Sequence, residues 1–144
     1  MEHGILTDRA GTAAAYAAGA DYVEPTILHN LLIEQADGTW QEAPLADAWQ
    51  PAPSFAVIAP AGLGLSDPAA DHEAIAQHLR LVMTAAARRA RPGATVVLGS
   101  GAARSTPEGV DPAAARAQLA RSVRLARDPA AERGLAGILE PLPR

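Results

Sequence analysis

Four short apolar, β-prone runs recur along the chain at intervals of about forty residues, and each stops at a polar residue, a proline or a glycine. They occupy residues 21–25, 54–60, 95–101 and 137–141. Helical sequence precedes the first run and the last two. A strand–helix unit repeated at this spacing builds a parallel sheet with helices outside it. The repeat therefore predicts an α/β fold made of parallel β/α units.

The number of strands is about half of what a closed barrel requires. Residues 3–6 are a fifth candidate strand, so the sequence supplies four to five. A complete (β/α)₈ barrel uses roughly 250 residues. We therefore expect residues 1–144 to form a single incomplete domain, a partial TIM barrel. The last residues, 140–144, break off where a strand would pass into its loop, which suggests a truncated chain.

Three helices are predicted between these strands, with aspartates as N-caps. The first covers residues 8–18 and ends before Gly19, the second runs from Asp71 to the Pro-Gly pair at 92–93, and the third opens at Asp111 and is kinked or restarted at Pro129. Residues 28–53 have the weakest pattern. They are interpreted as a short helical turn, an Asp-Gly turn at 37–38, and a proline-punctuated loop.

Composition excludes several classes of function. A formal net charge of −4 gives no general electrostatic reason to bind nucleic acid or an anionic membrane. The arginines on the third helix, Arg116, Arg121, Arg124 and Arg127, are interpreted as a solvated face. Without cysteine there is no disulfide, thiolate metal site or cysteine nucleophile. No signal-peptide core or membrane-spanning stretch is present, so a cytoplasmic location is expected.

Two glutamates follow predicted strands at their C-terminal ends, where parallel-barrel enzymes place their chemistry. Glu140 follows the last strand and is held by Pro141, and Glu24 takes the equivalent place in an earlier strand. A carboxylate inside a barrel mouth is costly unless it is paired or metal-bound. Glu140 is therefore the strongest candidate for a metal ligand or base, and Glu24 is a weaker candidate for contact with substrate.

The loop after the fourth strand is a candidate anion site. The backbone amides of Gly99, Ser100 and Gly101 can form a nest, and Arg104 can offer its guanidinium to a phosphate or carboxylate. The spacing matches neither GxGxxG nor a Walker loop. A plain strand-to-helix turn explains the glycines equally well. His29 follows the second strand, where a pocket residue can sit, although a surface loop is the simpler interpretation.

Four segments in order resemble the sugar phosphate isomerase/epimerase group of xylose isomerase-like TIM barrels. The segments are residues 20–25 (ADYVEP), 62–68 (GLGLSDP), 96–104 with 107–109 (VVLGSGAAR and PEG), and 139–142 (LEPL). The resemblance covers the N-terminal half of such a barrel. Related zinc-dependent repair endonucleases carry a histidine after strand three, where this chain has Ala59-Pro60, so the nuclease branch is not indicated.

The resemblance implies a divalent metal (Mn, Mg, Co or Zn) held by Glu, Asp, His and Glu at the ends of strands five to eight. Glu140 matches the first of these ligands, which also acts as a base that moves a proton between adjacent sugar carbons. The resemblance thus implies a role in carbohydrate metabolism. The other ligands would lie beyond Arg144. We therefore expect the chain alone to hold no metal and to be inactive, with a sugar or sugar phosphate as the substrate of a longer form.

Two alternatives stay open. One is a non-catalytic binding module, a half-barrel that forms homo-oligomers through its open sheet edges. The other is a different TIM-barrel lyase or hydrolase with the same layout. No nucleic-acid or membrane partner is expected under any of the three.

Overall fold

The computed structural model describes residues 1–44 and 50–141. Its helices are α1 (Thr12–Ala17), α2 (His72–Ala87) and α3 (Pro112–Ala131), with short 3-10 helices η1 (Ala61–Leu63) and η2 (Gly101–Arg104). Its strands are β1 (Gly4–Thr7), β2 (Tyr22–Pro25), β3 (Leu32–Glu34), β4 (Trp40–Glu42), β5 (Ala52–Phe55), β6 (Ala90–Val97) and β7 (Ala136–Ile138). None of the described helices has the length and apolar character needed to cross a bilayer.

The main strands are parallel and follow the order of the chain. β1 pairs with β2, and β5–β6–β7 form a second parallel sheet. A parallel bridge between Thr26 and Ala56 links the two, with the Ile27 amide donating to the Ala56 carbonyl at 2.8 Å. The parallel α/β class is thereby confirmed. The described strands do not close into a barrel, so membership of a partial barrel stays a prediction.

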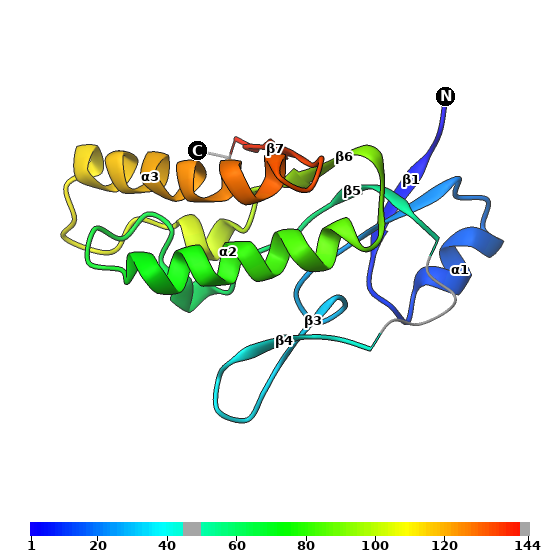
Figure 1. Ribbon diagram of the computed structural model, residues 1–144, viewed down its shortest axis with the longest axis horizontal. Helices are drawn as coiled ribbons and strands as arrows, with labels where there is room; N and C mark the ends of the chain where they lie inside the picture. The colour runs from blue at the N-terminus through cyan, green and yellow to red at the C-terminus, as the bar shows by residue number, and fades with distance from the viewer. Residues whose placement is uncertain (45–49, 142–144) are drawn as a thin grey trace.

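Helices α2 and α3 lie side by side against the β5–β6–β7 sheet (Figure 1). On β6, Ala94 and Val96 are buried beneath them, whereas Thr95 and Val97 are only half-buried and face the other way. This alternation is the period of two expected of a strand. One face of the sheet is therefore covered by helices, and the opposite face carries side chains that no helix covers.

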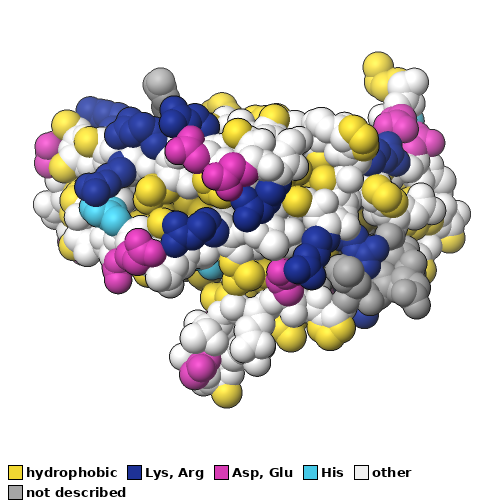
Figure 2. Space-filling model, in the orientation of Figure 1, with side chains coloured by type: hydrophobic (Ala, Val, Ile, Leu, Met, Phe, Trp, Pro, Cys, Tyr) yellow, Lys and Arg dark blue, Asp and Glu magenta, His cyan; other side chains and the backbone are white. Residues whose placement is uncertain are grey.

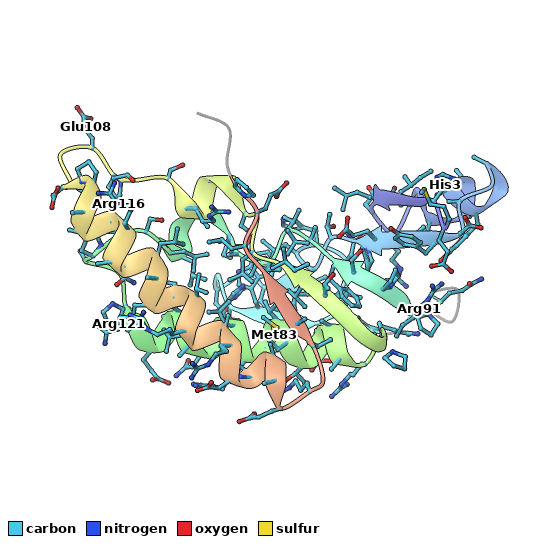
Figure 3. The ribbon with its side chains drawn as sticks, turned by 90° about the horizontal axis from the view of Figure 1, so that it is seen from above. His3, Met83, Arg91, Glu108, Arg116 and Arg121 are labelled. Atoms are coloured by element: carbon cyan, nitrogen blue, oxygen red, sulfur yellow. The ribbon has the colours of Figure 1, made fainter. Side chains whose placement is uncertain are left out.

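The caps and inner stripe of α2 are confirmed. The Asp71 carboxylate accepts hydrogen bonds from the Glu73 and Ala74 amides, and Asp111 caps α3 in the same way. The predicted stripe on α2 is fully buried, at Ile75, Leu79, Val82 and Ala86. Met83 of the same helix is also buried in this core (Figure 3). Helix-period patterning and aspartate caps thus place this element correctly.

The basic run on α3 is a solvated face, as predicted. All four of its arginines are exposed, and Figure 3 shows Arg116 and Arg121 on the side of α3 turned away from the sheet. Figure 2 shows acidic side chains interspersed among the basic ones on the face that α2 and α3 form. The expected absence of a nucleic-acid partner stays a prediction.

A turn is present at residues 27–31, where the Leu31 amide donates to the Ile27 carbonyl at 2.9 Å, but the structure corrects the interpretation of the residues that follow as a loop. β3 and β4 form an antiparallel hairpin, with Leu32 opposite Glu42 and Glu34 opposite Trp40. The predicted Asp-Gly turn joins them, with Gly38 at φ 80°. Asp-Gly between short strands favours a hairpin. Part of the predicted loop, residues 45–49, lies outside the described residues.

Strand boundaries also differ from prediction. Helix α2 ends at Ala87 and β6 already begins at Ala90, so the pair at 92–93 lies within a strand instead of ending the helix. The partner strand β5 starts at Ala52, and the register shifts between Ala52 and Ser54. Proline and glycine are tolerated where a ladder is irregular. Pairing between strands, which is not local in sequence, therefore sets these boundaries.

Two helices differ in length from prediction. The first helix is predicted over residues 8–18 with an aspartate cap, but α1 covers only Thr12–Ala17, and Gly11 at its N-cap provides no side-chain hydrogen bond. Helix α3 is longer than predicted. It continues through Pro129 to Ala131 instead of breaking there. The Pro129 carbonyl accepts a hydrogen bond from Arg133 Nη1 at 3.0 Å, and Pro129 and Ala130 are buried in the core. Pro129 lies in the last turn of α3, so the backbone hydrogen bond that it removes is near the end of the helix, and the helix tolerates its loss.

Candidate functional site

The C-terminal ends of β1, β2, β5, β6 and β7 lie along one edge of the molecule, because these strands are parallel. Ligands of open α/β sheets bind at this edge. Glu24, Glu140 and the loop at 99–104 all belong to strand ends on it. The prediction that these residues share one edge of the sheet is therefore confirmed.

The Glu140 side chain lies directly over Gly99. A Cβ atom placed on Gly99 would be 2.5 Å from Glu140 Oε2, closer than a real contact allows. Glu140 is exposed and the contacting atom is the end of its flexible side chain, so a side chain at position 99 would displace the carboxylate from this place. Gly99 follows Val97 on the face that no helix covers, and Gly99 is itself buried. The Glu140 carboxylate therefore lies at the edge of the sheet, over Gly99, on the face opposite the described helices.

Arg104 ties the ends of two strands together. Its Nη1 donates to the carbonyl oxygens of Leu98 at 2.7 Å, Gly99 at 3.1 Å and Glu140 at 2.7 Å. The residue is 9% exposed. Burial lowers the pKa of the Arg104 guanidinium, while the negative charge of Glu140 raises it. An arginine stays charged under these influences, so the group is a cationic clamp on the backbone next to Glu140.

Ser100 makes a second tie between strand ends. Its Oγ accepts hydrogen bonds from the Ile58 and Ala59 amides, both at 3.0 Å, and so joins the segment after β5 to the end of β6. Gly101 opens η2, and its carbonyl accepts from Ser105 Oγ at 3.3 Å. The side chains of Ser100 and Arg104 are therefore engaged within the protein. Contact of this loop with a substrate stays a prediction.

Glu24 lies on the same edge but at a distance from Glu140. It is half-buried in β2 opposite Leu6, on the strand face away from the buried Val23 and Pro25. β5 and β6 lie between β2 and β7, so three strand spacings, roughly 14 Å, separate the two carboxylate-bearing strands. One small ligand does not bridge that distance. Glu24 and Glu140 are therefore parts of one edge, not one cluster.

Sequence analysis missed a second hollow on this edge, beside β1, β2 and β5. A cavity of about 480 Å³ is lined there by polar residues from the segments after β1 and β2. His29 is one of them, so its place beyond the second strand is a pocket position. The signal available in the sequence was the polar run after each strand, Asp8-Arg9 and His29-Asn30.

Two of the other histidines, His72 and His78, have structural partners. The ring of His72 lies 2.8 Å from Gln118 Oε1, and His78 Nε2 lies 2.8 Å from the Ile58 carbonyl oxygen. Trp40 of the hairpin contacts the rings of His29 and His78 edge-on. His78 is buried, which lowers its pKa, and its hydrogen bond to Ile58 offsets this in part.

The free energy of unfolding should decrease as the pH falls below the ordinary histidine pKa of 6.5. The unfolded chain then takes up a proton at position 78 that the folded chain, with its lowered pKa, resists. The stability from neutral His78 is therefore complete above about pH 6.5 and declines on acidification. Urea unfolding of the natural chain and of His78→Gln, from about pH 7 to pH 5, measures this. An equally steep decline in the variant would contradict the assignment.

The described residues do not form a metal centre by themselves. No group of three or more His, Cys, Asp or Glu side chains able to hold a metal ion occurs within residues 1–44 and 50–141. Glu140 has a guanidinium beside it instead of a second acidic ligand. Catalytic metal sites use about three protein ligands. The donor set described here therefore does not fit a complete divalent-metal site.

In comparisons with known proteins, no family model, curated protein or solved structure matches this chain.

Proposed function

We propose that this chain forms the N-terminal half of the substrate site of a sugar or sugar-phosphate isomerase or epimerase built on a TIM barrel. The observation that carries the proposal is the place of Glu140. Its carboxylate lies over Gly99 at the C-terminal edge of a parallel sheet, on the face without helices. In a barrel, that face lines the interior and that edge is the mouth. The strand order β1-β2-β5-β6-β7 supports the same arrangement.

The chemistry proposed for Glu140 is proton transfer. A carboxylate within hydrogen-bond reach of an acidic C–H next to a carbonyl can remove that proton and return it to the neighbouring carbon. Arg104 holds the Glu140 carbonyl at 2.7 Å and so fixes the backbone that carries the base. Gly99 leaves room for the carboxylate on the open face. A positioned base with space in front of it is the minimum that such a reaction requires.

The metal ligands other than Glu140, and the second base, are not among the residues described. Glu140 supplies one carboxylate ligand, and the remaining ligands would come from a longer form of the protein. A two-base transfer also needs a second proton carrier. We therefore expect the chain of residues 1–144 to bind sugars weakly and to have no turnover.

Deuterium incorporation tests this proposal. Aldoses, ketoses and their phosphates are incubated in D₂O with Mn²⁺, Mg²⁺, Co²⁺ or Zn²⁺, and exchange at the carbon next to the carbonyl is followed by NMR. A longer form that adds further strands should catalyse exchange. Glu140→Gln should slow that exchange by about 100-fold or more, because it keeps the shape and removes the base. Unchanged exchange in this variant would contradict the assignment.

One control variant and one further test accompany this experiment. Glu108→Gln changes a carboxylate at an exposed loop tip far from the sheet (Figure 3) and should leave exchange unaltered. For residues 1–144 alone, a titration with the same sugars should move the amide signals of Gly99 and Glu140. A complete panel of sugars that moves neither signal would also count against the proposal.

A non-catalytic, self-associating module is the second candidate function. The observation that favours it is the exposure of large apolar side chains on the two outermost strands, β1 and β7. This candidate predicts association without any sugar-dependent exchange.

A further inference from the structure

The cavity beside β1, β2 and β5 is far from Glu140 along the edge and is built from different strands. Its volume is about 480 Å³, and its polar lining is Asp8 and Arg9 after β1 with Thr26, His29 and Asn30 after β2. Leu28 and Val57 add apolar wall. It occupies the C-terminal end of parallel strands, the edge at which such sheets bind ligands.

Two residues of this cavity have strained backbones. His29 has φ 66° and Val57 has φ 51°, so both lie in the left-handed region that favours glycine. For a β-branched residue such as valine this conformation is a true outlier. Strain of this kind persists where the surroundings enforce it, and it clusters at binding sites. Both outliers line the same cavity.

The surroundings that enforce the strain are hydrogen bonds around Asn30. Its Oδ1 accepts from the Arg9 amide at 2.6 Å, and its Nδ2 donates to Thr26 Oγ1. Asn30 is buried, so these bonds are shielded from water. The Leu28 amide donates to the Val57 carbonyl at 3.1 Å. The segments after β1, β2 and β5 are therefore locked to one another, and the cavity is preformed.

The lining groups select a type of ligand. Arg9 carries a permanent charge and a fork of donors suited to carboxylate or phosphate. Asp8 uses Oδ1 to accept from the Gly11 amide at 2.8 Å, and its second oxygen can accept from a hydroxyl. The His29 imidazole can donate or accept, and its ring is braced by Trp40 at a centroid distance of 5.3 Å.

We propose that this cavity binds a small hydroxylated anion. The carboxylate or phosphate of the ligand pairs with Arg9, and its hydroxyl groups contact His29 and Asp8. This site goes beyond the function proposed above, because none of its residues takes part in the Glu140 chemistry. It stands or falls independently of that chemistry.

Four three-carbon or smaller probes test the chemistry of the ligand: glycerol 3-phosphate, glycerate, glycerol and inorganic phosphate. Each is titrated into the intact chain while amide signals are followed by NMR. We expect one of the two hydroxylated anions to bind at least about tenfold more tightly than glycerol and than inorganic phosphate. The signals of residues 8–10, 26–30 and 57 should move. Which anion binds identifies the phosphate or the carboxylate as the charged end.

Variants then test the residues. Arg9→Gln keeps the backbone amide that Asn30 holds, and it should weaken binding by about tenfold or more. Arg121→Gln, on the exposed side of α3, should leave affinity unchanged. His29→Asn keeps a residue that tolerates left-handed backbone and removes the ring, so affinity should fall while the melting temperature stays close to that of the natural chain.

A further variant separates a functional strain from an incidental one. His29→Gly relieves the positive φ and should raise the melting temperature while it weakens binding. The proposal would be overturned by glycerol binding as tightly as both anions, by Arg9→Gln retaining full affinity, or by inorganic phosphate alone binding as well as the hydroxylated anions. Amide shifts confined to other parts of the chain would overturn it as well.

Discussion

Replacing Arg104 with alanine is expected to lower the free energy of unfolding by about 3 kcal/mol. The loss follows from three carbonyl oxygens that share one donor. Arg104 Nη1 donates to the carbonyl oxygens of Leu98 and Gly99, which follow β6, and to that of Glu140, which follows β7. Hydrogen bonds to charged groups contribute more than neutral ones, and buried carbonyls left without partners carry a further cost. Urea unfolding followed by circular dichroism measures the change.

Two variants frame this measurement. Arg104→Lys retains the charge but not the planar guanidinium, and should recover only part of the loss. Arg116→Ala removes an exposed arginine from α3 and should change stability by less than about 0.5 kcal/mol. If Arg104→Ala were as mild as Arg116→Ala, the clamp would not hold the strand ends.

The isolated chain is expected to self-associate at high micromolar concentration, with a mass at least twice the 14.8 kDa of the monomer. The reason is that parallel sheets are normally buried, and here both outer strands are open. Large apolar side chains are exposed on these strands, at 43% for Ile5, 52% for Leu6 and 47% for both Ile138 and Leu139. Because β1 and β7 point the same way, the β7 edge of one copy can pair in parallel with the β1 edge of another.

Edge variants test this mode of association. Leu6→Lys and Ile138→Lys put a charge on one edge each, and either one should shift the mass measured by light scattering toward the monomer. Ile33→Lys is the matched control. Ile33 is 38% exposed but lies on the β3–β4 hairpin, away from the two parallel edges. A monomeric natural chain, or equal effects of all three lysines, would rule out association through β1 and β7.

The sequence by itself determined where α2 and α3 begin, which face of α2 is buried, and the class of the fold. Asp71 and Asp111 cap α2 and α3 because a carboxylate next to free amides needs no distant partner. The buried stripe from Ile75 to Ala86 follows from the helical period alone. The repeat of about forty residues specified parallel strands in chain order, since a strand–helix–strand unit must return in the same direction. Each of these properties is local, or repeats locally.

Only the tertiary structure decided where strands pair and what the loop residues do. β6 takes in Pro92 and Gly93 because Ala90 pairs with Ala52, which lies far away in the sequence. The backbone contacts of Arg104 depend on three carbonyls from two strand ends meeting at one nitrogen. The strained Val57 was invisible in the sequence for the same reason. Its φ is imposed by the elements packed around it, and no local preference of valine favours that value.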